Sequence, residues 1–452
     1  MIGAKSVKRA IAFLALAAFA GAPLLTAAEA QRSATYEGVA SCAGSTCHGR
    51  AEGNGAVVRQ DEIATWQEPS SPSGAHSRAF AVLDSPRGRQ IAATLGLGSP
   101  ASAGECLGCH ATPAGQRGAQ FHASDGVGCE ACHGPASGWI ASHYAMGGTH
   151  AANVAAGMVP LEQPQTRARV CLDCHFGSAA NGQFVTHRLM AAGHPRISFE
   201  LDLFSAQQQH HDVDADYLAR KGRPSSVRLW AVGQAEAVRR SVDLFARPDR
   251  GTWGIFPELY FYDCHSCHRG ISDGPQRKLT FETNPGRPIP FGMPPYNDEN
   301  MIMLSAAARV LAPGQAAGFD AASKDFHRAM GEGRPQAAAA ARRLGASAAA
   351  LSDALARGGY GSNEAFSVIA AIADRTTAPR FTDYAGSAQA VMAIDTLLNA
   401  LVREGPVTVG AAAGIRADIN RAYAAVRSPA SYDPAEFRAA LGKAARSIGA
   451  LR

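Results

Sequence analysis

The chain has 452 residues and a mass of 47.0 kDa, which is long enough for two or three domains. Charged residues make up only 18% of it and aromatic residues 7%, so side chains alone would form a thin core unless another apolar component fills the interior. The formal net charge is +5, but no Lys/Arg-rich run carries interleaved aromatic residues, so we do not expect nucleic-acid binding.

Residues 1–30 have the pattern of a secretory signal peptide. Basic residues precede an apolar run from Ala10 to Leu25, and Ala28-Glu29-Ala30 provides a small-x-small cleavage site before Gln31. A membrane anchor is the alternative, but the run contains Gly and Pro and is short for a span of about 20 apolar residues. We therefore expect a mature chain without a transmembrane span that is exported to the periplasm, with the extracellular space and the outer membrane as alternatives.

The segment 31–270 is organised around ten cysteines, which fall into five pairs, each followed directly by a histidine. Four pairs have the spacing Cys-x-x-Cys-His, and the first pair has two further residues between its cysteines. The cysteines are Cys42, Cys47, Cys106, Cys109, Cys129, Cys132, Cys171, Cys174, Cys264 and Cys267, and the histidines that follow them are His48, His110, His133, His175 and His268.

These pairs predict five covalently attached c-type haems. Two thiols one helical turn apart form thioethers with the two vinyl groups of a haem, and the adjoining histidine binds the iron as proximal ligand. A zinc protein or a disulfide framework has no reason to place a histidine after every pair. For Cys42 and Cys47 a disulfide or an inert loop is the alternative, although it leaves His48 unexplained. The macrocycles would also supply apolar surface for the core and propionate charge of roughly −10.

Ten further histidines are available as distal iron ligands, and nine of them lie within the same segment. We rank His76, His143, His187 and His194 first, while His210 and His211 compete for one role. His265 lies between the two cysteines of its own motif, so it cannot turn to that iron, but it can bind a neighbouring haem. For His122 and His150 a solvated or propionate-bonded side chain is an equal alternative, and His327 is expected to be an ordinary histidine.

Regular structure in this segment is predicted to be sparse. Ser85 as N-cap, Pro86 at the first helical position and Gly96 as a stop predict one helix. Trp139 and His143, four residues apart, would share a helical face. The spacing of seven between two of the ranked histidines, 187 and 194, is nearly two helical turns, so each can reach a different haem.

The rest of the chain predicts helices without haem. Apolar residues recur at helical spacing over 225–245, which predicts one long amphipathic helix covering the haem cluster. Residues 271–297 are rich in proline and predict an extended linker. Residues 298–452 contain no cysteine and have Ala-rich runs, and their last helix begins at a capping box from Asp433 to Glu436. The expected fold is mainly α: a haem-packed multihaem cytochrome c domain with little regular structure, followed by an Ala-rich α-helical bundle.

The stretch from Cys42 to about Gly270 resembles multihaem c-type cytochromes of the cytochrome c-554 family. The resemblance is carried by Gly-Val-Gly-Cys-Glu-Ala-Cys-His-Gly-Pro at 126–135 and His-Arg-Leu-Met-Ala-Ala-Gly-His-Pro-Arg at 187–196, with weaker support from His-Ser-Arg-Ala-Phe at 76–80. It implies an exported electron carrier with mostly bis-histidine haems, and related multihaem proteins include nitrogen-oxide redox enzymes. This chain departs from that pattern in having five motifs rather than four, a longer first motif and an added C-terminal helical region.

The expected function is electron transfer between redox proteins whose identity the sequence does not give. No catalytic residue is assigned, because a carrier is favoured over an enzyme. The alternative is an oxidoreductase with one open haem that acts on a small nitrogen-oxide substrate such as nitrite or hydroxylamine. A third interpretation is a docking protein, and a homo-oligomer or a larger electron-transfer assembly stays open.

Overall fold

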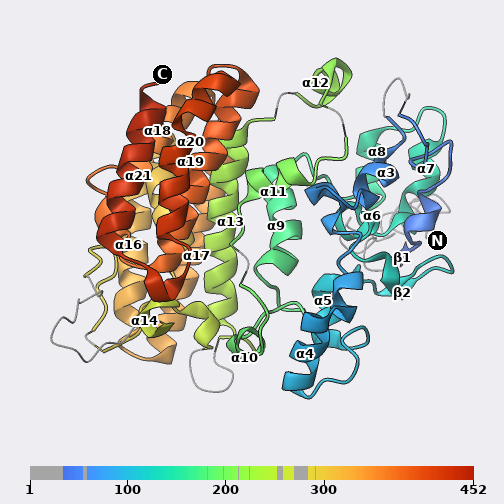
Figure 1. Ribbon diagram of the computed structural model, residues 1–452. Helices are drawn as coiled ribbons and strands as arrows, with labels where there is room; N and C mark the ends of the chain where they lie inside the picture. The colour runs from blue at the N-terminus through green and yellow to red at the C-terminus, as the bar shows by residue number, and fades with distance from the viewer. Residues whose placement is uncertain are drawn as a thin grey trace, which may run out of the picture.

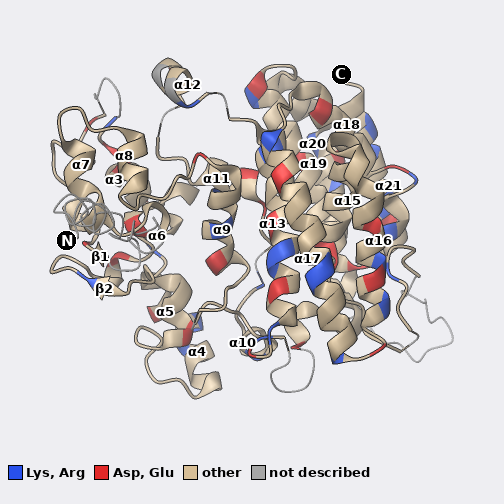
Figure 2. Ribbon diagram, turned by 180° about the vertical axis from the view of Figure 1, so that it is seen from behind, with Lys and Arg blue, Asp and Glu red and all other residues tan. Residues whose placement is uncertain are grey.

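The computed structural model describes residues 34–53, 59–180, 182–196, 198–211, 213–222, 224–251, 258–268, 283–290 and 292–452. The predicted signal peptide and part of the predicted linker lie outside these residues. The described chain is mainly α, as predicted, and forms two lobes (Figure 1). Short helices and loops make up the N-terminal lobe, long helices make up the C-terminal bundle, and helix α13 stands between them, as the view from behind in Figure 2 also shows.

The N-terminal lobe has little regular structure, in line with the prediction. Its α-helices are α3 (Glu62–Gln67), α4 (Pro86–Leu95), α5 (Gly104–His110), α6 (Cys129–His133), α7 (Ile140–Tyr144), α8 (His150–Ala155), α9 (Pro164–His175), α10 (His187–Ala191), α11 (Leu201–Gln207) and α12 (Ala215–Lys221). Short 3-10 helices are η1 (Val39–Ser41), η2 (Pro72–Ala75), η3 (Ala81–Asp84), η4 (Ala123–Asp125), η5 (Ala136–Gly138) and η6 (Leu259–Phe261). Strands β1 (Thr35–Tyr36) and β2 (Gln116–Arg117) pair in parallel, with Thr35 opposite Gln116.

The C-terminal bundle consists of α15 (Glu299–Leu311), α16 (Pro313–Ala329), α17 (Arg334–Arg357), α18 (Ser362–Ile372), α19 (Tyr384–Glu404), α20 (Val409–Ala425) and α21 (Pro434–Gly449), with η7 (Ala378–Arg380) and η8 (Pro429–Ser431). The predicted Ala-rich composition suits this packing, because small side chains let helices approach closely. Ala306, Ala307 and Ala308 of α15 are all fully buried. Short α14 (His265–His268) lies against η8 at one end of the bundle.

Helix α13 (Ser226–Ala246) is the predicted long helix, and it begins after the Ser225 N-cap. Sixteen of its 21 residues are buried, which is more than a one-sided amphipathic helix would bury. Trp230 and Val242 belong to the bundle core, whereas Leu229 and Ala237 pack with α9 and α11 of the N-terminal lobe. The helix therefore forms a wall shared by both lobes rather than a cover over one of them.

Buried polar contacts join the two lobes across this wall. On α13, the Glu236 carboxylate accepts hydrogen bonds from Arg169 Nε of α9 at 3.2 Å and from Ser352 Oγ of α17 at 2.7 Å. Farther along, Arg403 Nη2 of α19 donates to Asp202 Oδ2 of α11 at 2.8 Å. Because a buried carboxylate is costly without partners, these contacts favour one docked arrangement of the lobes.

Local signals in the sequence located helix ends accurately. Helix α4 begins after Ser85, whose side chain accepts a hydrogen bond from the Gly88 N–H, and ends at Gly96 in the left-handed conformation, which confirms the predicted helix. Helix α21 begins after Asp433, which caps the N–H groups of Ala435 and Glu436, as predicted.

Among the described residues, α19 is the one helix long and apolar enough to cross a membrane by length and composition. Its apolar stretch is 72% buried inside the bundle, and a core helix of a water-soluble fold passes the same test.

Candidate metal centres

Each of the four strict motifs lies at the C-terminal end of a helix. Helices α5, α6, α9 and α14 all end at the histidine of their motif, at His110, His133, His175 and His268. An α-helix turns once in 3.6 residues, so cysteines three apart lie on one face, and the following histidine lies beside them at the helix end. The local fold therefore presents two thiols and one imidazole to the same place.

In the longer first motif, as in a strict motif, the backbone N–H of the histidine donates to the carbonyl of the first cysteine. In the strict motif of α14, the His268 N–H donates to the Cys264 carbonyl at 2.8 Å. In the first motif, the His48 N–H donates to the carbonyl of Cys42 at 3.1 Å, six residues back. The two additional residues are accommodated in a turn in which the Cys47 N–H donates to the Gly44 carbonyl at 2.8 Å. The first cysteine and the histidine thus meet as they do in the strict motif.

Every histidine that follows a cysteine pair faces a second imidazole, and the ring centroids are nearly equally spaced. The centroid distances are 6.1 Å for His48 and His143, 6.1 Å for His76 and His175, 6.3 Å for His110 and His194, 6.3 Å for His187 and His268, and 6.3 Å for His133 with each of His210 and His211. A metal–imidazole bond is about 2.0 Å long, so an ion between two rings holds their centroids about 6 Å apart. The centroid separation in these pairs is therefore the one expected for two imidazoles bound to one metal ion.

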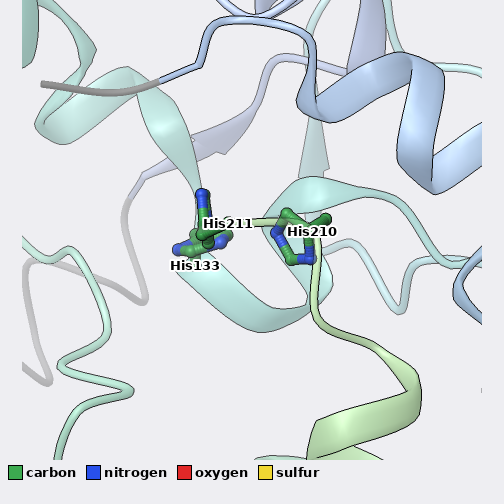
Figure 3. Close-up of side chains that lie close together, drawn as sticks. All are labelled: His133, His210 and His211. Atoms are coloured by element: carbon green, nitrogen blue, oxygen red, sulfur yellow. The ribbon is translucent and has the colours of Figure 1, made fainter. Parts of the chain in front are cut away.

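His133 has two candidate partners, both from the loop after α11 (Figure 3). The potential ligand nitrogens of His133, His210 and His211 all lie within 4.8 Å of one another. His210 Nδ1 lies 2.8 Å from the Gln208 carbonyl, which can only accept, so this nitrogen carries the proton and Nε2 has a free lone pair. His211 instead places Nδ1 3.6 Å from the Glu62 carboxylate.

Other rings in these pairs are oriented in the same way. His110 Nδ1 donates to the Ala79 carbonyl at 2.7 Å, and His194 Nδ1 donates to the Pro195 carbonyl at 2.8 Å. A hydrogen bond from one ring nitrogen fixes the tautomer and leaves the other nitrogen as a metal ligand.

Burial keeps several of these imidazoles neutral, which is the state that binds a metal. Burial and, less strongly, nearby histidines lower the pKa of His133 to about 3. Burial lowers the pKa of His175 to about 4 and, together with neighbouring His211, that of His210 to about 4.

The structure does not bring His265 beside a second histidine in the part of the chain it describes. Its Nδ1 donates to the Pro429 carbonyl at 2.8 Å, and its ring meets the Tyr432 ring edge-on at 5.1 Å. The packing of α14 against η8 thus directs this side chain into the bundle. His150 binds Glu162 at 2.8 Å. His327 is fully buried in α16, beside Tyr296.

Sequence reasoning missed Glu62. Its Oε2 lies 2.9 Å from Nδ1 of His48, fourteen residues earlier. No continuous helix or strand joins the two residues, so the periodicity of the sequence does not predict their contact. Burial alone would raise the pKa of Glu62, but the interactions with His211 and His48 outweigh it and hold the pKa below its usual range. The side chain is therefore an ionised carboxylate with 6% exposure.

Contacts between motifs define a spatial order that differs from the order in sequence. The first and third motifs meet where Cys42 and Cys129 lie within hydrogen-bonding reach. The third and fourth are neighbours because α6 packs on α9. The fourth and second meet where Cys174 Sγ lies 3.8 Å from the Gly108 carbonyl. The fifth adjoins the second through Arg196, which follows His194 and places Nη1 3.8 Å from Cys264 Sγ. With the motifs numbered in chain order, their spatial order is therefore 1-3-4-2-5.

Cysteine pairs at helix ends, each beside a histidine that faces another histidine, are the binding features of a c-type cytochrome. Residues 41–134 match the family described as cytochrome c554 and c-prime, which confirms the predicted resemblance over this segment and supports a c-type cytochrome family. The match includes the first three motifs, the longer one among them, and supports covalently bound haem c with an electron-transfer or redox role. Comparisons with curated proteins and with solved structures found no match.

Proposed function

We propose that the chain is an exported pentahaem c-type cytochrome that carries electrons between redox proteins. The observation that carries this proposal is the pairing of all five motif histidines with a second imidazole at a metal-bridging distance. The proposed distal ligands are His143, His194, His210, His76 and His187, for the motifs numbered 1 to 5 in chain order. Bound haem c supplies one-electron Fe(III)/Fe(II) chemistry.

The row of attachment sites supports transport through the protein. The motifs follow one another in space in the order 1-3-4-2-5, with Arg196 linking the fifth to the segment that carries His194, so the sites form one series rather than isolated centres. The exposed cysteines, Cys47 and Cys267, belong to the first and last sites of that row, while the other eight are partly buried. The two ends of the row are thus the parts most accessible to redox partners.

Export of the chain is part of the proposal, and the predicted signal peptide supports it. In an oxidising compartment free thiols would pair into disulfides. All ten cysteines are free of disulfides in the structure, and attachment to haem as thioethers would keep them from pairing.

The first test distinguishes a carrier from an enzyme with an open haem. With imidazole on both faces of every iron, the oxidised protein should give only low-spin electron paramagnetic resonance signals, and the reduced protein should not bind carbon monoxide. The ring planes also predict the signal shapes. Planes at 18° and 30° interact with the same iron d orbital and split the dxz and dyz levels, whereas planes at 61°, 87° and 89° leave them closer in energy.

We therefore expect two rhombic low-spin signals, from haems 1 and 5, and three highly anisotropic ones. A stoichiometric high-spin signal with carbon monoxide binding would favour the enzyme. The spectrum should be recorded on the purified holoprotein with spin quantification, because a minor damaged fraction also gives a high-spin signal.

The second test is the haem count. Intact mass spectrometry should give a polypeptide that begins near Gln31 with five covalent haems. A mass with four haems would show that the motif from Cys42 to His48 does not attach a haem, although its first cysteine and its histidine meet as in a strict motif. We expect the variant Cys42→Ala to disrupt haem attachment at that site alone. If the site attaches no haem, the variant should have the same haem count as the unsubstituted protein.

A further inference from the structure

The Glu62 carboxylate places a negative charge beside a proposed iron ligand, His48. Glu62 is the first residue of α3, and its carboxylate lies 2.9 Å from Nδ1 of His48 and 3.6 Å from Nδ1 of His211. Only 6% of its side chain is exposed. Because water is largely excluded, the charge is screened less than on the surface.

The other Nδ1 contacts of proposed ligands in the described chain are to neutral groups, and that of His143 is to the Asn153 side-chain amide at 3.4 Å. Backbone carbonyls of Ala79, Pro195 and Gln208 accept from His110, His194 and His210, respectively. Among the proposed ligands with such a contact in the described chain, His48 is the one that donates to a carboxylate. This difference concerns a single site, at one end of the row of motifs.

The physical consequence concerns the two oxidation states. A carboxylate that accepts the Nδ1 proton makes the imidazole a stronger electron donor and places a negative charge near the iron. Both effects stabilise Fe(III), which has one more positive charge than Fe(II), and so lower the reduction potential.

We infer that Glu62 sets the reduction potential of haem 1 and holds it below the value that a backbone acceptor would give. The inference rests on the proposed ligation by His48 and His143. Glu62 acts through His48 and is a positioning residue, not a ligand.

The test is a potentiometric titration of the holoprotein, followed by optical absorbance and by the rhombic resonance signals predicted for haems 1 and 5. The variant Glu62→Gln keeps the size and an acceptor oxygen but removes the charge. At a fixed potential near the midpoint of haem 1, its ratio of reduced to oxidised haem should rise roughly tenfold, which is about 59 mV for a one-electron couple. One of the two rhombic signals should titrate at a higher potential in the variant, and the titration of the other should be unchanged.

Two further variants complete the design. Glu62→Asp retains the charge and should restore most of the low potential. Glu162→Gln removes the carboxylate that binds His150, a histidine outside the proposed pairs, and should leave all potentials unchanged. An unchanged potential in Glu62→Gln, or an equal shift in Glu162→Gln, would overturn the inference. If instead His143→Ala leaves every haem low-spin, the proposed ligation itself is wrong.

Discussion

Replacing His143 with alanine is expected to convert one of five haems from low-spin to high-spin and to create a carbon monoxide site in the reduced protein. The ring lies 6.1 Å from that of His48, and among the described residues no other imidazole ring is paired with that of His48. Without it, the iron keeps only its proximal ligand. We expect the same change of one fifth of the haem for His76→Ala, His187→Ala and His194→Ala, measured by spin quantification.

The matched control is His150→Ala. This histidine lies seven residues after His143, and it binds Glu162 rather than facing a motif histidine. All five haems should remain low-spin in the variant. A distal variant with an unchanged spectrum would remove that residue from the proposed ligand set, while a high-spin haem in the control would show that spin state responds to damage elsewhere.

His210 and His211 need a separate comparison, because both rings lie 6.3 Å from that of His133. The bond from His210 Nδ1 to the Gln208 carbonyl orients Nε2 for ligation, so His210→Ala should give a high-spin haem and His211→Ala should not. If both single variants stay low-spin, each ring can replace the other, and only the double variant should open the site.

Features that depend on neighbouring residues could be predicted from the sequence. Cysteine spacing gave the motifs, and capping chemistry placed the ends of α4 at Ser85 and Gly96, because each requires only a few consecutive residues. The mainly α fold likewise followed from periodicity and composition.

Counting the histidines outside the motifs limited the candidates for the distal iron ligands. It could not show which candidate pairs with which motif histidine. The partners His76 and His175 are 99 residues apart, and nothing in their local sequence links them. Glu62 had no signal at all, because its role arises only when α3 folds back onto the first motif. The position of α13 was misjudged for a related reason. Its apolar stripe was expected to face the haem cluster, but that stripe packs in the bundle core. Small residues outside the stripe, such as Ala237, form a second buried face against α9.

That shared wall leads to the last prediction, for Trp230→Ala. Trp230 is fully buried in the bundle core on α13. Truncation of such a large side chain leaves a cavity and costs about 3–5 kcal/mol. For lobes of this size the melting temperature should fall by roughly 10 °C. Trp230→Phe should recover much of the loss, since it fills most of the volume.

The measurement follows helix content by far-ultraviolet circular dichroism and haem ligation by visible absorbance in the same thermal scan. Because α13 packs on α9, which carries the fourth motif, and on α17 of the bundle, both signals should move together to lower temperature. The control is Val409→Ala, an apolar residue of α20 with 74% exposure, which should leave both transitions in place. A shift in Trp230→Ala no larger than in the control would refute a core position for α13. A loss of helix signal before any change in haem absorbance would show that the lobes unfold independently, and that the contacts of Glu236 do not couple them.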